Sequence, residues 1–142
     1  MPSTNDRATL AAVSAAQLAC GIASAAVAVR RGHAFDLGLV RGDPTRVAAE
    51  ACTIGTALSA PAPMLVTQAV ATGVVLSRDS RRATSTLGWL GAAMIGGYLA
   101  ERLVRQRLRP AGWEQVETPL VVTGLGLSAA MATLGLRNPR PQ

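Results

Sequence analysis

The chain has 142 residues, of which 49% are apolar, and its fourteen basic residues outnumber eight acidic ones, giving a formal net charge of +6. A basic chain can indicate nucleic-acid binding. Here every basic residue is an arginine, and the four longest gaps between arginines coincide with four apolar stretches. Arginine gathered in the connections is typical of membrane spans and argues against nucleic acid as a partner. The lysine-free, alanine-rich composition indicates a bacterial genome, so we expect a multi-pass protein of the bacterial inner membrane.

The first apolar stretch covers residues 9–29. Its 21 or so residues suffice to cross a hydrocarbon core of roughly 30 Å. The alternative is a cleaved signal peptide, because Ala23-Ser24-Ala25 resembles a small-residue cleavage site. Asp6 offsets Arg7 ahead of the stretch, and the apolar run is long and diluted by polar residues. These features favour a membrane span.

The second stretch, residues 50–77, belongs to a longer helical pattern. Asp43 is a good N-cap and Pro44 a good first helical residue. An unbroken helix from there to Ser77 would have about 34 residues and a length of roughly 51 Å, which exceeds the ~30 Å of a bilayer core. Pro61 and Pro63 each remove a backbone donor. We therefore expect a long second helix that is broken at these prolines.

Two topologies follow from that break. In the first, residues 50–77 cross as a kinked span, the chain crosses four times, and the first and third loops share a side. In the second, the prolines form the turn of a re-entrant hairpin. Irregular backbone at membrane depth must be sheltered by protein, which favours four crossings. The distribution of arginines favours re-entry, so the sequence leaves both open.

The remaining spans are expected at residues 87–104 and 119–136. Trp89 and Tyr98 lie near the ends of the third, where aromatic rings prefer the membrane interface. Thr118 and Pro119 are typical of the cap and first residue of a helix. A soluble bundle would need a charged face at helical spacing, which these stretches lack. The predicted fold is all-α: a single polytopic domain over residues 1–142, an integral membrane four-helix bundle.

Small residues recur every four positions on the third and fourth stretches, and such faces let helices approach closely in lipid. The predicted packing residues are Gly88, Ala92, Gly96, Gly124 and Ser128. Gln17 and Gln68 are expected to form hydrogen bonds between helices.

The sequence offers little for metal or cofactor chemistry. Without lysine there is no phosphate-binding P-loop, and His33 alone cannot supply paired histidine ligands. The stretch Gly124 to Ala129 fits G-x-G-x-x-A, but a dinucleotide site needs a βαβ unit around it. We expect no cofactor and no metal.

Two acidic residues in or near predicted spans are the candidates for catalysis. Glu50 is expected about two turns into the second helix, and Glu101 at the end of the third. Ionisable groups in spans are functional candidates, with Trp89 and Tyr98 then lining the substrate site. The structural alternative pairs each acid with an arginine on its own helix, Glu50 with Arg46 and Glu101 with Arg105.

Three functions remain. The first is a non-catalytic membrane component, a subunit, assembly factor or partner-binding protein that acts through helix packing or self-association. The second is a membrane-embedded enzyme for acid–base isomerisation or cyclisation of a lipophilic small molecule. The third is a small transporter, which is the weakest because the first stretch carries no acidic residue. All three place the chain in a lipid bilayer.

Overall fold

The structure is a computed structural model and describes residues 4–137, which are all-α. Four long helices dominate: α1 (Thr4–Arg31), α3 (Ala62–Ser77), α4 (Arg81–Ala100) and α6 (Glu117–Leu136). The short elements are α2 (Val47–Ala51), α5 (Arg102–Arg107) and the 3-10 turn η1 (Pro110–Gly112). Each long helix packs against two others, in the pairs α1–α3, α3–α4, α4–α6 and α1–α6, with α4 and α6 the most closely joined.

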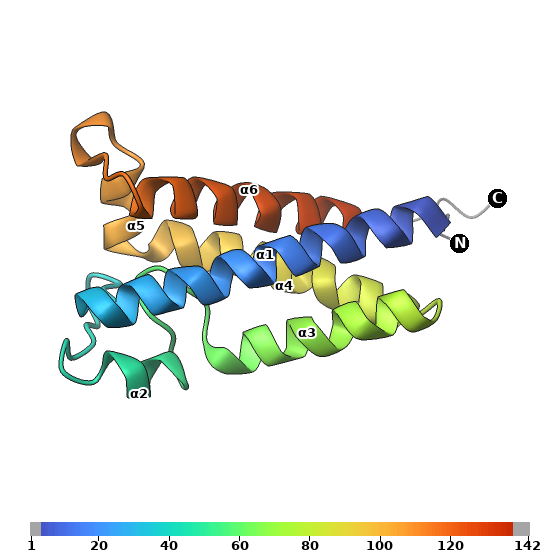
Figure 1. Ribbon diagram of the computed structural model, residues 1–142, viewed down its shortest axis with the longest axis horizontal. Helices are drawn as coiled ribbons and strands as arrows, with labels where there is room; N and C mark the ends of the chain where they lie inside the picture. The colour runs from blue at the N-terminus through green and yellow to red at the C-terminus, as the bar shows by residue number, and fades with distance from the viewer. Residues whose placement is uncertain (1–3, 138–142) are drawn as a thin grey trace.

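The long helices alternate in direction, so the connections gather at two ends (Figure 1). Residues 32–61 and 101–116 lie at one end, which we call the loop end. The start of α1, the turn at residues 78–80 and the end of α6 lie at the other. In this arrangement α3 runs from the loop end toward the opposite end, and residues 44–61 stay at the loop end. The re-entrant hairpin of residues 44–77 is therefore not adopted, and the four long helices follow one another in alternating directions.

The predicted long second helix is wrong. α2 ends at Ala51, residues 52–61 form turns, and α3 begins at Ala62. Gly55 has a φ of +107°, which L side chains rarely adopt. Pro61 precedes the first residue of α3, and Pro63 lies in its first turn, where a helix needs no backbone donor. The two prolines thus start a helix and do not interrupt one.

The third predicted span also needs correction. α4 begins earlier than expected, at Arg81, because the Ser80 side chain accepts a hydrogen bond from Ala83 N at 3.3 Å. It ends at Ala100, and Glu101, with extended backbone angles, separates it from α5. The fourth stretch agrees with α6 at its last residue. The start of α6 differs from the prediction. The side chain of Glu114, and not that of Thr118, accepts a hydrogen bond from the first backbone N–H of the helix, Glu117 N, at 2.6 Å.

The middle turns of α1 and the buried face of α3 carry polar residues, while the exposed faces of these two helices are mainly apolar. On α1 the buried stripe includes Ser14, Gln17 and Ser24, whereas the exposed positions between residues 12 and 29 are all alanine, isoleucine or valine. On α3 the buried residues include Gln68 and Thr72, and the exposed ones include three large apolar side chains, at positions 66, 70 and 76. A soluble helix has the opposite distribution.

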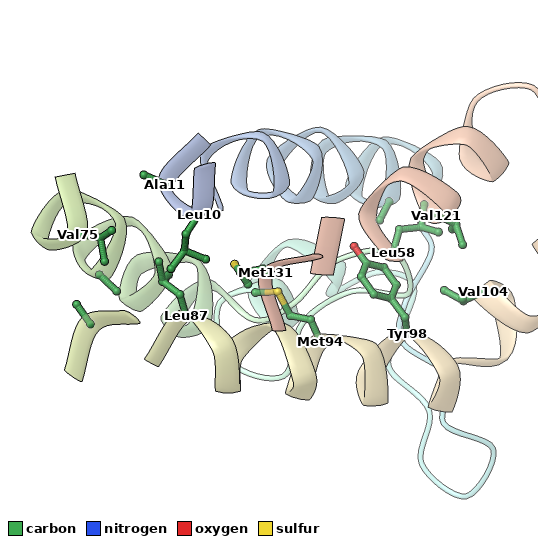
Figure 2. Packing of buried hydrophobic residues seen from close by; sticks show 13 residues of the cluster. Leu10, Ala11, Leu58, Val75, Leu87, Met94, Tyr98, Val104, Val121 and Met131 are labelled. Atoms are coloured by element: carbon green, nitrogen blue, oxygen red, sulfur yellow. The ribbon is translucent and has the colours of Figure 1, made fainter. Parts of the chain in front are cut away.

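The buried polar side chains hydrogen-bond to one another. Gln68 Nε2 on α3 donates to Gln17 Oε1 on α1 at 2.8 Å and to the Ser14 carbonyl at 2.9 Å. Ser14 Oγ lies 2.8 Å from Thr72 Oγ1, and Gln17 Nε2 donates to Ser128 Oγ on α6 at 3.4 Å. The predicted bonding of Gln17 and Gln68 between helices is confirmed. Figure 2 shows the apolar cluster that includes Leu10, Leu87 and Met131, and Met131 of this cluster contacts Gln68 Nε2 of the network.

Glycines hold α4 and α6 close together. A Cβ on Gly91 would lie 2.6 Å from the Ser128 carbonyl oxygen, and one on Gly88 would lie 2.7 Å from the Gly135 backbone. Gly124 faces Tyr98 in the same way. Ala92 is half-buried, and Gly96 is exposed with no atom within 4 Å of its Cβ position. The expected four-residue ladder is therefore wrong beyond Gly88, because the face that meets α6 continues through Gly91 instead.

Two helices among the described residues, α1 and α6, are long and apolar enough to cross a membrane. α3 is apolar but shorter, with 16 residues. At 1.5 Å per residue it is about 24 Å long.

Candidate functional site

Two acidic groups at the loop end, Glu117 and Glu101, are buried in different surroundings. Glu117 is the first residue of α6 and its side chain is 0% exposed. Its Oε1 accepts from Arg31 at 2.7 Å and lies 2.8 Å from His33 Nε2. Its Oε2 accepts from Arg107 Nε at 2.7 Å. One carboxylate therefore joins the end of α1, the first loop, α5 and α6.

Glu114 completes this group. It lies 3.3 Å from Arg31 and accepts hydrogen bonds from the backbone of Val116 and Glu117 at the start of α6. We call Arg31, His33, Arg107, Glu114 and Glu117 the Glu117 cluster. Both carboxylate oxygens of Glu117 are occupied by strong donors, so it is poorly suited to accept a proton from a substrate. The cluster locks the loop end together.

The Glu117 cluster is not among the sites predicted from the sequence. Its members Arg31 and Glu117 are 86 residues apart, so no local spacing joins them. One signal was present: an acid immediately before the Thr118-Pro119 helix start, at the same end of the molecule as the arginines in the last turn of α1. Complementary charges at the ends of adjacent antiparallel helices are expected to pair once the topology is known.

Glu101 lies just beyond the end of α4 and is 5% exposed. Its Oε1 accepts from Asp36 N at 2.8 Å, and Arg102 N donates to the Asp36 carbonyl at 2.9 Å. Burial raises the pKa of Glu101 to about 7, although the N–H groups at Asp36 and Leu103 offset part of the rise. Near neutral pH this carboxyl group can therefore hold or release a proton.

Glu101 and Tyr98 line one apolar cavity of about 160 Å³. It lies between α3, α4 and the 52–61 segment. Met64 of α3, Ile54 of that segment and Phe35 of the first loop also line it. Burial of Tyr98 between helices is visible in Figure 2, where its ring points from α4 toward α6. The structure thus brings together one predicted catalytic residue and one predicted substrate-lining residue.

The other two candidates lie elsewhere. Glu50 is in the first turn of α2, not two turns into a span, and its Oε1 accepts from Asp43 N at 3.0 Å. Trp89 is 67% exposed on α4, in a surface groove with Arg81 and Arg82. Neither residue lines the cavity of Glu101.

The predicted pairing of the acids with nearby arginines is absent among residues 4–137. No ion pair joins Glu50 to Arg46, and Glu50 Oε2 is buried without a hydrogen-bond partner. Arg105 donates to the carbonyls of Leu99 and Ala100 and forms no ion pair with Glu101. Within the same residues, no three His, Cys, Asp or Glu side chains are grouped to hold a metal ion.

No protein-family model, curated protein or solved structure matches this chain.

Proposed function

We propose that the chain is an integral membrane protein whose four long helices form a membrane-spanning bundle, placed in a bacterial inner membrane. The observation that carries this proposal is the burial pattern: polar side chains lie inside and apolar ones face outward on α1 and α3. In water, an exterior of this kind would be unfavourable, because soluble monomers rarely expose large contiguous apolar patches. In lipid the same exterior is solvated, and the buried hydrogen bonds hold the helices together.

Within the membrane, we propose a non-catalytic role as a subunit, assembly or partner-binding component that acts through helix packing. The outward face of α1 supports this role. Its exposed positions include alanines at 12, 15, 16, 19, 23 and 26. Small side chains allow a second membrane helix, from another subunit or a second copy, to approach closely. The exposed face of α3 has the larger Val66, Val70 and Leu76 and suits contact with lipid tails.

The experiment has two stages. Alkaline carbonate extraction of native membranes tests membrane integration, and release of the chain into the supernatant would contradict the four-span proposal. Mild detergent extraction followed by native mass spectrometry then tests association. Substituting Ala15 and Ala19 together by Leu should abolish the complex, whereas Ala69→Leu on the exposed face of α3 should leave it intact. A wild-type chain that extracts as an uncomplexed monomer would refute the packing role.

A second candidate function is supported by the cavity beside Glu101. A membrane-embedded enzyme for acid–base isomerisation or cyclisation needs few groups, and Glu101 and Tyr98 line one apolar site. Glu50 does not belong to it. In a deletion strain, this candidate predicts that Glu101→Gln abolishes complementation at normal protein abundance, while Glu50→Gln complements fully. Full complementation by both variants would exclude it.

A further inference from the structure

The cavity between α3 and α4 is lined by one acidic residue and otherwise mainly by apolar residues. Glu101 is its single charged residue. The aromatic rings of Phe35 and Tyr98 line it, and two hydroxyl residues of the 52–61 segment, Thr56 and Ser59, add the remaining polar groups. Its volume is about 160 Å³, and an apolar cavity of roughly 150 Å³ holds a benzene-sized molecule.

Glu101 also lines a second, more polar surface pocket with His33, Arg41 and Arg102, but no basic side chain among residues 4–137 forms an ion pair with it. α3 and residues 52–61 carry no charged side chain, and α4 contributes only Tyr98 as a titratable neighbour. From the first loop, Asp36 is itself acidic and already lies 3.2 Å from Arg41. From α5, Arg102 is directed to Asp36 at 3.9 Å, and Arg105 donates to backbone carbonyls.

Glu101 differs from Glu117 in having no basic side chain paired with it among the described residues. Both carboxyl groups are buried at the loop end, and Glu117 receives three basic side chains whereas Glu101 forms no ion pair within residues 4–137. Buried carboxylates are normally paired or protonated, because desolvation is costly. A cavity that presents such a group is complementary to a cation carrying an apolar body. Aromatic walls also favour a cation.

We propose that this cavity binds a small lipophilic amine, with the ammonium group at Glu101 and an apolar body about the size of one ring between α3 and α4. Binding would leave the hydrogen bond from Asp36 N to Oε1 in place, since a carboxylate can accept several donors. The inference depends on the fold and not on the helix-docking role of α1.

The test uses 2-phenylethylamine as the probe and 2-phenylethanol as a neutral molecule of the same shape. Binding to the purified full chain in detergent is measured by calorimetry at pH 8, where the amine is protonated and Glu101 is ionised. A hydrogen bond to a charged group is strong enough that the amine should bind roughly tenfold to a hundredfold more tightly than the alcohol. Glu101→Gln should remove this preference, and Glu50→Gln, which changes an acid outside the cavity, should preserve it.

A second pair of variants tests the location without changing any charge. Gly97 lines the cavity and Gly96 does not, and a Cβ at either position meets no atom within 4 Å. Gly97→Leu should therefore fill the cavity and abolish binding of the amine, while Gly96→Leu should bind it as the wild type does. Equal binding of amine and alcohol, no binding of the amine at millimolar concentration, or unchanged binding by Gly97→Leu would each overturn the proposal. If Glu101→Gln fails to fold, the glycine pair and the amine–alcohol comparison still decide.

Discussion

Replacing Glu117 by Gln should destabilise the loop end severely. The substitution keeps the size of the side chain but removes the charge that receives Arg31, His33 and Arg107 at 2.7–2.8 Å. A glutamine also places an amide NH₂ where one carboxylate oxygen accepted hydrogen bonds, so at least one arginine meets another donor. The guanidinium groups would be left facing a group that cannot neutralise them.

The magnitude follows from burial. Breaking a buried ion pair by removing one partner costs about 3–5 kcal/mol. Here the acid is 0% exposed, but the side chains of Arg31 and Arg107 are 38% and 23% exposed and can regain some hydration. We therefore expect the free energy of unfolding to fall by about 3 kcal/mol at the lower end of that range. For a chain of this size that corresponds to a fall in Tm of roughly 10 °C.

The assay is thermal unfolding in detergent, followed by the fluorescence of Trp89 and Trp113, together with hydrogen exchange. Exchange should accelerate in α5 and the first turn of α6 before it does in the centre of α3. Glu114→Gln should give a smaller fall in Tm, because this side chain is partly exposed, and Asp79→Asn at the opposite end should give none. A Tm for Glu117→Gln within 2 °C or so of wild type would refute the conclusion that the cluster locks the loop end.

Three further predictions concern the core and Glu101. Gly91→Val should lower the free energy of unfolding by about 1–3 kcal/mol or more, because its Cβ would lie 2.6 Å from the α6 backbone. Gly126→Val, which has open space around its Cβ position, should leave the Tm unchanged in the same thermal assay. Gln68→Leu should cost on the order of 1 kcal/mol, the scale of hydrogen bonds between membrane helices, and a loss above about 3 kcal/mol would show that the network is worth more than these bonds. Burial raises the pKa of Glu101 from an ordinary value of 4.5 to about 7. Between these pH values the native state binds more protons than the unfolded state, so the contribution of Glu101 to the free energy of unfolding should fall as pH rises from 4.5 to about 7. Measured as wild type minus Glu101→Gln, a stability difference that stays flat from pH 4.5 to 7 would contradict this assignment.

The difference measurement matters because other acids respond to pH in the opposite sense. The pKa values of Asp36 and Glu114 are lowered, chiefly by the backbone N–H groups of Gly38 and Glu117 respectively. Their contribution to stability is present above the ordinary pKa and is lost as pH falls. Subtracting the Glu101→Gln curve removes the contribution of Glu114 from the comparison, whereas the difference includes the coupling of Glu101 to the adjacent Asp36.

The sequence was sufficient to place α1 and α6, but not the bounds of α3 and α4 or the way in which the helix ends are joined. The arginine-free apolar stretches located α1 and α6 well, because length and hydrophobicity are local properties. The second helix was misplaced because Asp43 and Pro44 form a good start signal, and the turn at Gly55 was overlooked. The positive φ of Gly55 ends the helical pattern that was predicted to continue from the start signal at Asp43 and Pro44.

The candidate site was predicted in part for the same reason. Glu101 and Tyr98 are three residues apart on one helix end, so local spacing brought them together. Glu50 was placed with them only by its position in a helix that does not extend as predicted. The partners of Glu117 come from three separate segments, α1, the first loop and α5, and pairing across so many residues depends on the packed topology.

The Glu117 cluster also has a consequence for the order in which the protein is made. Arg31 and His33 leave the ribosome well before Glu117, the first residue of α6. Until then the guanidinium groups of Arg31 and Arg107 and the imidazole of His33 have no Glu117 to receive them, and the loop end cannot close. Packing of α6 against α1 and α5 is thus the step that brings the shared carboxylate to the earlier segments, and a nascent chain halted before residue 117 would lack the group that joins Arg31 to Arg107.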